Sequence, residues 1–130
     1  MSKILIIEDS QPLISLLTKK LILEGFDSEF VLQSGNLTRE DIVEQILDKK
    51  PDLIILDLNM PGAGGIAVLE ELRFKEKEQN LREFPIVILT ALDADQSEIE
   101  YLKSNARIVD YVQKPIADLP AFVKSLKKLI

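Results

Sequence analysis

The chain has 130 residues, of which 46% are hydrophobic, so residues 1–130 are expected to form one domain around one core. Its 22 acidic and 16 basic side chains give a net charge of -6, which repels nucleic acid and anionic membranes, and neither is expected as a direct partner. The sequence contains no cysteine and no histidine, which excludes disulfides, thiolate metal sites and catalysis by imidazole.

The first predicted element is a strand at residues 3–9, KILIIED, a β-branched run typical of a strand covered on both faces. A helix follows, with Pro12 in its first turn and Gly25 just beyond its end. Its apolar residues have helical spacing: Leu13, Ile14, Leu16, Leu17, Leu21 and Ile22. Residues 27–32, DSEFVL, are a weaker strand candidate.

A second helix is predicted over residues 38–49, where Thr38 and Asp41 resemble a capping box. Pro51 ends this helix, and the next strand is predicted at residues 52–58, DLIILDL.

A third helix is predicted to begin near Gly65. Its apolar residues are Ile66, Leu69 and Leu72. The charged run that follows, residues 73–84, is expected to be a solvated extension or a loop.

The last third of the chain repeats the alternation. Strands are predicted at residues 85–91 and 107–114, and helices at residues 97–104 and 119–130. The final helix has four apolar positions expected to face the core: Phe122, Val123, Leu126 and Leu129.

Strict alternation of strands and helices predicts an α/β fold, with a parallel sheet and helices on both of its faces. In such open sheets, the functional site lies at the carboxyl ends of the strands, where the strand order reverses. The four strong strand candidates all end in polar groups at this edge: Glu8 and Asp9, Asp57, Thr90, and Lys114. We therefore expect these side chains to form one pocket.

Three carboxylates in one pocket repel one another unless a cation lies between them. Mg²⁺ is the expected ion, because it prefers oxygen ligands and the chain has no histidine or cysteine for zinc or copper. Thr90 and Lys114 supply a hydroxyl and a positive charge that suit phosphoryl oxygens, and an aspartate can itself be the nucleophile of phosphoryl transfer. Without Mg²⁺, replacing Asp9 or Asp57 by asparagine is expected to leave the fold at least as stable.

Each of these residues also has a simpler interpretation. Asp9 or Ser10 could only cap the first helix, Asp57 could be a turn residue, and Lys114 could be an ordinary surface lysine. The small residues at 62–65, GAGG, match no phosphate-binding loop and are expected to form a mobile loop beside the site.

The acidic pair, the string Asp57-Leu-Asn-Met-Pro with Gly65 eight residues later, Thr90-Ala91 and Lys114-Pro115 together resemble the receiver domain of two-component response regulators. The resemblance extends over essentially the whole chain. It implies a single-domain receiver with a five-stranded parallel sheet, doubly wound as a flavodoxin-like three-layer sandwich with strand order 2-1-3-4-5.

The resemblance also implies a chemistry. Asp57 would accept a phosphoryl group from a phosphohistidine on a histidine kinase or a histidine phosphotransfer protein. Mg²⁺ would be held by Glu8, Asp9, Asp57 and the backbone carbonyl of Asn59. Thr90 and Lys114 would bind phosphoryl oxygens, Ala91 would leave room for them, and the peptide before Pro115 would be cis.

A conformational switch is a further implication of the resemblance. Thr90 would move toward the phosphoryl group and Tyr111 would change rotamer, altering a surface of the fourth helix, fifth strand and fifth helix that an unknown target protein reads. The turn before Tyr111 departs from the family, because Asn105-Ala106 replaces the usual Gly-Ala pair and lies two residues further from the tyrosine. Asn105 is expected to adopt the left-handed conformation there. Leu92 and Asn59 occupy positions that tune the phosphoryl lifetime in similar proteins.

Three alternatives to a phosphoryl-accepting switch stay open. The first is a receiver-like interaction module that works without phosphate. The second is an aspartyl-phosphate phosphatase of the haloacid dehalogenase type, although that chemistry uses a second aspartate where this chain has Asn59. The third and weakest is a nucleotide-binding protein of the same topology. The leading reading is not an enzyme, since it promotes only its own phosphorylation and dephosphorylation. No uncharged run approaches the roughly 18 residues that cross a bilayer, so no membrane contact and a cytoplasmic location are expected.

Overall fold

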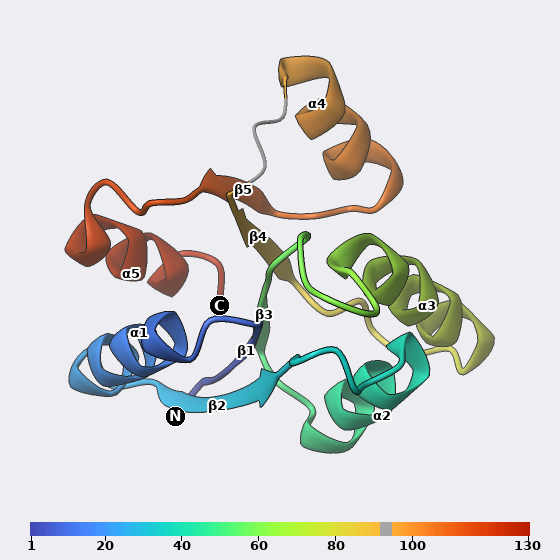
Figure 1. The fold of residues 1–130 in the computed structure, drawn as a ribbon, viewed down its shortest axis with the longest axis horizontal. Helices are drawn as coiled ribbons and strands as arrows, with labels where there is room; N and C mark the ends of the chain where they lie inside the picture. Colours follow the sequence, from blue (N-terminus) through green and yellow to red (C-terminus); the bar gives the residue numbers. More distant parts are fainter. Residues whose placement is uncertain (92–94) are drawn as a thin grey trace.

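The computed structural model describes residues 1–91 and 95–130, apart from the side chains at 96 and 98. Strands and helices alternate along this part of the chain (Figure 1). The strands are β1 (Lys3–Glu8), β2 (Asp27–Leu32), β3 (Leu53–Leu56), β4 (Ile86–Thr90) and β5 (Asp110–Gln113). The helices are α1 (Gln11–Leu23), α2 (Arg39–Lys49), α3 (Gly65–Glu78), α4 (Gln96–Asn105) and α5 (Leu119–Lys127). Leu92 lies outside the described residues.

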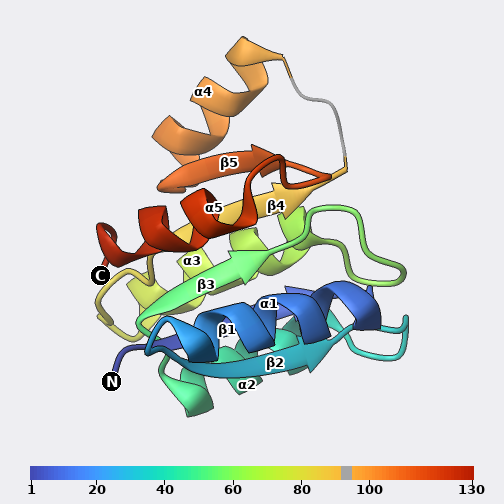
Figure 2. The ribbon, with the colours of Figure 1, turned by 90° about the vertical axis from the view of Figure 1, so that its left-hand side faces the viewer.

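The five strands form one parallel sheet in the order β2-β1-β3-β4-β5. Figure 2 shows α1 and α5 in front of this sheet and α2 and α3 behind it. The predicted α/β fold and strand order are therefore confirmed. Because β1 lies between β2 and β3, the chain reverses its direction of winding there, and the ends of β1 and β3 lie next to each other.

Two apolar cores lie on the two faces of the sheet. In β1, Ile4 and Ile6 pack toward α1 and α5, whereas Leu5 and Ile7 pack toward α2 and α3. All side chains of β3 and β4 are buried, as the continuous apolar runs predicted. Among the described residues, no helix combines the length and apolar character needed to span a bilayer.

The helix starts follow from local capping. Ser10 caps α1, where its Oγ accepts a hydrogen bond of 3.3 Å from the amide of Leu13. Thr38 and Asp41 form the predicted capping box of α2, with bonds of 3.0 and 2.9 Å. Since Ser10 takes the capping position, the carboxylate of Asp9 remains outside this role.

Three of the apolar residues that mark the helical spacing are exposed. Leu16 and Ile22 of α1 are 52% and 58% exposed, and Ile66 of α3 is 41% exposed. Each lies at the margin of its helix's apolar stripe, where hydrophobicity alone does not distinguish the core from its edge. The structure also places the left-handed residue of the α4–β5 turn at Arg107, with a φ of 56°, instead of Asn105. Asn105 ends α4 and donates a hydrogen bond from Nδ2 to the carbonyl of Tyr101.

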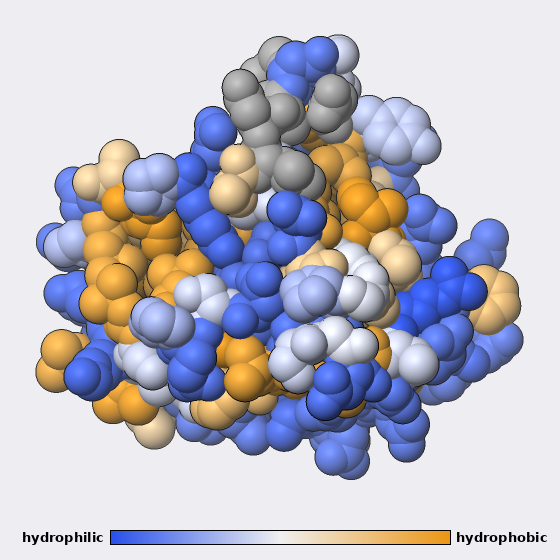
Figure 3. Space-filling model, in the orientation of Figure 1, coloured by the Kyte–Doolittle hydropathy of each residue, from blue (hydrophilic) through white to orange (hydrophobic). Residues whose placement is uncertain are grey.

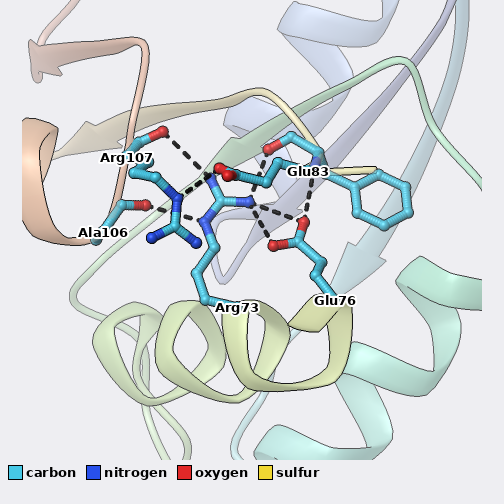
Figure 4. A network of polar contacts seen from close by, with 6 residues as sticks. Arg73, Glu76, Glu83, Ala106 and Arg107 are labelled. Atoms are coloured by element: carbon cyan, nitrogen blue, oxygen red, sulfur yellow. Dashed lines mark hydrogen bonds and ion pairs between the residues drawn. The ribbon is translucent and has the colours of Figure 1, made fainter. Parts of the chain in front are cut away.

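The charged run at residues 73–84 is partly the expected solvated extension and loop, since residues 79–84 form no helix or strand and most of the run is exposed, but two of its charged residues are buried. It continues α3 to Glu78, and Arg73 and Glu76 are 9% and 2% exposed. The Arg73 guanidinium donates to both carboxylate oxygens of Glu76, at 2.9 and 2.8 Å (Figure 4). It also donates to the carbonyls of Phe84, Ala106 and Arg107, at 3.0, 2.9 and 3.3 Å.

This network explains the altered turn before β5. Arg73 joins α3 to both carbonyls of the turn at residues 106–107, and Glu76 accepts a bond of 2.7 Å from the amide of Phe84, just before β4. The side chain of Arg107 pairs with Glu83, at 2.6 Å. These bonds hold the positive φ of Arg107, which otherwise disfavours a residue with a Cβ.

We predict that Arg73→Leu lowers the free energy of unfolding by roughly 3 kcal/mol, because it leaves the buried Glu76 carboxylate without its cation. Urea denaturation measures the change. The double variant Arg73→Leu, Glu76→Leu should recover part of the loss, since the unpaired charge is then removed. Equal stability of Arg73→Leu and the unmodified protein would show that the network contributes nothing.

Candidate functional site

The sheet brings the predicted strand-end residues to one edge. Lys114, just after β5, places its Nζ 2.8 Å from Glu8 Oε2, at the end of β1. The same Nζ lies 3.2 Å from Asp57 Oδ2, just after β3. These three side chains come from positions separated by up to 106 residues, yet they share one ammonium group.

The three predicted acids form one cluster. Glu8, Asp9 and Asp57 each offer a carboxylate oxygen within 4.8 Å of the other two. Glu8 and Asp57 are 1% and 3% exposed, whereas Asp9 is exposed to solvent. Oxygen donors that converge in this way, with one open side, fit a hard divalent cation that keeps some of its water.

The two buried carboxylates differ in their electrostatics. Burial, together with the neighbouring Asp9 and Asp57, raises the pKa of Glu8 to about 7, although Lys114 acts against this. Burial also acts to raise the pKa of Asp57, but the Asn59 amide, Glu8, Lys114 and Thr90 outweigh it, and the pKa of Asp57 is lowered. Asp57 is therefore the acid that stays ionised most readily.

Lys114 keeps its charge in this environment. Burial acts to lower its pKa, but the hydrogen bond and charge of Glu8 and the charge of Asp57 outweigh burial, and the pKa of Lys114 is raised. The ammonium group is thus available for an additional anion beside Asp57.

Asp57 is fixed by the turn that follows it. Its Oδ1 accepts a hydrogen bond of 3.0 Å from the amide of Asn59. The start of α3 then folds back against the end of β3, with the Gly65 amide donating to the carbonyl of Leu58 at 3.0 Å. A Cβ on Gly65 would collide with the carbonyl oxygen of Asp57 and lie 2.7 Å from the Cα of Leu58, so this close approach requires glycine.

Thr90 ends β4 and is fully buried. Its hydroxyl is one of the groups that lower the pKa of Asp57, which places it beside that carboxylate. Its carbonyl accepts a bond of 2.8 Å from the amide of Lys114, and the Lys114–Pro115 peptide is cis, as the family resemblance implied. Ala91, the next residue, is exposed.

A hollow of about 440 Å³ adjoins Lys114. It is lined by side chains from α1, from the residue directly after β4 and from residues 114–119: Leu13, Leu16, Ala91, Lys114, Pro115, Ile116 and Leu119. Figure 3 shows hydrophobic side chains gathered on the side of this face where Figure 1 places α1 and α5.

Tyr111 is half-buried on β5, beside Ile88 of β4, and packs against the core under α2 and α3. Its predicted part in a switch stays a prediction, as does the use of the Asn59 carbonyl as a metal ligand.

One further polar residue, Gln33, lies at this edge and was not predicted from the sequence. Gln33 directly follows β2 and is fully buried. Its backbone amide donates a hydrogen bond of 3.0 Å to the carbonyl of Glu8. The signal that indicates Gln33 is the same as for the other site residues, a polar side chain directly after a strand, but the strand at 27–32 has the weakest apolar pattern.

The chain is similar to known proteins in sequence and in fold. The model of the response regulator receiver domain matches residues 4–127, and the chain belongs to this family. Among solved structures, the response regulator TrrA of Thermotoga maritima, in complex with Mg²⁺-BeF, is 28% identical, with a TM-score of 0.76 over 100% of both chains. The BeF₃-activated N-terminal receiver domain of RstA from Klebsiella pneumoniae is 26% identical, with a TM-score of 0.75 over 98% of both chains.

A further similar structure is the chemotaxis protein CheY4 of Vibrio cholerae. It has a TM-score of 0.79 and covers 100% of this chain and 99% of its own, but at 20% identity it supports the fold alone.

The pKa shifts indicate that charge repulsion in the cluster destabilises ionised Glu8 and not ionised Asp57. The lowered pKa of Asp57 means that its charge favours the fold at neutral pH, so Asp57→Asn is not expected to be stabilising. The raised pKa of Glu8 means the opposite, that its ionised form disfavours the fold. The stability that Glu8 contributes is fully present below its ordinary pKa of 4.5 and is lost as the pH rises through about 7.

We predict that, without divalent ions, Glu8→Gln raises the free energy of unfolding at pH 8 by about 2 kcal/mol and changes it little at pH 4, because the variant has no buried carboxylate to ionise. Chemical denaturation of both proteins across this pH range measures the difference. A variant that is less stable than the unmodified protein at pH 8 would contradict the assignment of the repulsion to Glu8.

Proposed function

We propose that this receiver domain is a phosphoryl-accepting switch in which Asp57 takes a phosphoryl group from a phosphohistidine of a histidine kinase or a histidine phosphotransfer protein. The observation that carries the proposal is the position of Lys114. Its ammonium group contacts two buried carboxylates, those of Asp57 and Glu8. A structural lysine needs only one of these partners, whereas an incoming phosphoryl group needs a charge beside the nucleophile.

The acid cluster supports Mg²⁺ as the cofactor. Glu8, Asp9, Asp57 and the backbone carbonyl of Asn59 would hold the ion, since the three carboxylates converge and Asp9 is open to solvent. When bound, Mg²⁺ neutralises charge on the transferring phosphoryl oxygens.

The protein groups have distinct parts in the transfer. An oxygen of the ionised Asp57 forms the new bond to phosphorus, while the P–N bond of the phosphohistidine breaks and its electron pair returns to the imidazole. The Asn59 amide orients the Asp57 carboxylate through the 3.0 Å bond to Oδ1. The Lys114 ammonium and the Thr90 hydroxyl bind phosphoryl oxygens, and Ala91 leaves space beside Thr90.

The surroundings of Lys114 suit an approaching partner. A partner must bring its imidazole to covalent distance of Asp57, so it has to cover the rim of the site. The hollow beside Lys114 offers apolar side chains for this contact, including Leu13 and Leu16 of α1 and Ile116.

We propose that phosphorylation then changes the surface formed by α4, β5 and α5, through Thr90 and Tyr111, and that a target protein, still to be identified, reads this surface. The loose packing of α4 supports this. None of its described side chains, at 97 and 99–105, is fully buried, so a shift of the helix costs little packing. Such a switch works by shifting the population of two arrangements.

We propose further that the domain is not a turnover enzyme and promotes only its own phosphorylation and dephosphorylation. Asn59 occupies the position where an aspartyl-phosphate phosphatase needs an acid. Its side chain is exposed, and its backbone amide donates a hydrogen bond to Asp57. An asparagine side chain cannot protonate a leaving group.

We predict that phosphoramidate with Mg²⁺ adds one phosphoryl group to the protein and that Asp57→Asn abolishes this addition, because the nucleophile is lost. Intact-protein mass spectrometry measures the addition. Asp48→Asn, which removes an exposed carboxylate of α2, is the matched control and should be labelled like the unmodified protein. Equal labelling of the Asp57 variant would contradict the proposed function.

A further inference from the structure

Gln33 is a buried polar residue that has no role in the phosphoryl transfer proposed above. It follows β2 at the edge of the sheet where the acids gather, and its side chain is fully buried. Through its backbone amide it is hydrogen-bonded to the carbonyl of Glu8. A buried amide side chain is costly unless its hydrogen bonds are satisfied, so its partners indicate why it lies here.

Every hydrogen-bonding position of this side chain is occupied. Oε1 accepts from the amides of Gly35 and Leu37, at 3.0 and 3.2 Å. Nε2 donates to the carbonyl of Leu37 at 2.8 Å and to the carbonyl of Ala63 at 3.3 Å. An amide group offers two donor and two acceptor positions, so one side chain joins the loop after β2 to the loop after β3.

The two loops also touch through their backbones. Gly35 and Gly62 have φ values of 106° and 72°. A Cβ on Gly62 would lie 3.0 Å from the carbonyl oxygen and 3.2 Å from the Cα of Gly35, so a larger residue would separate the loops. Two glycines therefore permit the contact that the Gln33 side chain fastens.

The loop that Gln33 fastens is the one that carries Asn59. It starts at Asp57, whose Oδ1 receives the Asn59 amide, and it ends at Gly65, which packs on the carbonyl of Asp57. Gln33 holds the loop at Ala63, between the two. Movement of this loop would displace both the amide that orients Asp57 and the carbonyl proposed as a metal ligand.

We infer that Gln33 is a positioning residue of the metal site: by joining the loops after β2 and β3, it holds the Asn59 backbone in place for Mg²⁺ and Asp57. The inference rests on the proposed function, because it assigns the cation to this cluster. Gln33 does not touch the ion or the phosphoryl group and acts only through the loop.

The test compares Mg²⁺ binding in the unmodified protein and in Gln33→Met, which keeps the side-chain length but lacks the amide. Isothermal titration should show a dissociation constant for Mg²⁺ that is roughly tenfold higher in the variant, the lower end of the effect expected for residues that orient metal ligands. Hydrogen exchange in the absence of metal should be faster at the amides of residues 59–63, excluding Pro61, and unchanged in β4.

Leu126→Ala is a control that shows whether a loss of stability alone weakens Mg²⁺ binding. Leu126 is buried between α5 and the sheet, away from both loops, so its truncation lowers stability but should leave the Mg²⁺ dissociation constant unchanged. Should Gln33→Met fail to fold, Gln33→Asn serves in its place, because its amide is one methylene shorter and cannot reach both Ala63 and Leu37.

The outcomes distinguish this inference from the function on which it rests. If the unmodified protein binds Mg²⁺ and the Gln33 variant binds it equally well, Gln33 is only structural and the inference is overturned while the proposed function stands. If Leu126→Ala weakens binding as much as the Gln33 variant does, the inference is likewise overturned. If the unmodified protein binds no Mg²⁺, the proposed function fails, and the inference with it.

Discussion

Lys114 holds two buried carboxylates, from the ends of β1 and β3, on a single ammonium group. Without that cation, Glu8 and Asp57 would be like charges in a poorly solvated pocket, and one of them would have to take up a proton. The order of the sheet makes the contact possible, because β1 and β3 are neighbours and β5 closes the same edge through β4. Fold and chemistry therefore depend on each other. The parallel sheet brings the charged side chains together, and the ion pairs with Lys114 reduce the repulsion between the two carboxylates.

The pairing is unequal, and the inequality suits a phosphoryl acceptor. Asp57 accepts a hydrogen bond from the backbone amide of Asn59 and has a lowered pKa. Glu8 has a raised pKa and lies closer to Lys114. A nucleophile should be ionised at neutral pH, while a neighbouring acid with a raised pKa is one that a divalent cation can relieve. The loop after β3 supports the arrangement, since Asn59, Gly65 and Gln33 each fix part of it.

Much of this could be predicted from the sequence, because buried parallel strands have an unmistakable apolar pattern and end at one edge. This pattern predicts Asp57 and Lys114 at the site, and their chemistry suits a cation and a phosphoryl group, while the family resemblance adds the histidine-phosphate donor, the Asn59 carbonyl and the switch. The misses have physical reasons. Arg73 and Glu76 look like solvated charges in a sequence, and only the fold shows that they neutralise each other and that Arg73 also binds the turn at Arg107. Gln33 was overlooked because β2 is an edge strand, whose partly exposed residues give a weak pattern.

A crystal structure of the protein with Mg²⁺ and beryllofluoride tests the central claim most directly. The account predicts beryllium on a carboxylate oxygen of Asp57, with Lys114 and Thr90 contacting its fluorides. It also predicts the metal ion among Glu8, Asp9, Asp57 and the Asn59 carbonyl. A beryllofluoride group on another residue, or an ion bound away from these acids while Lys114 keeps both of its carboxylate partners, would contradict it.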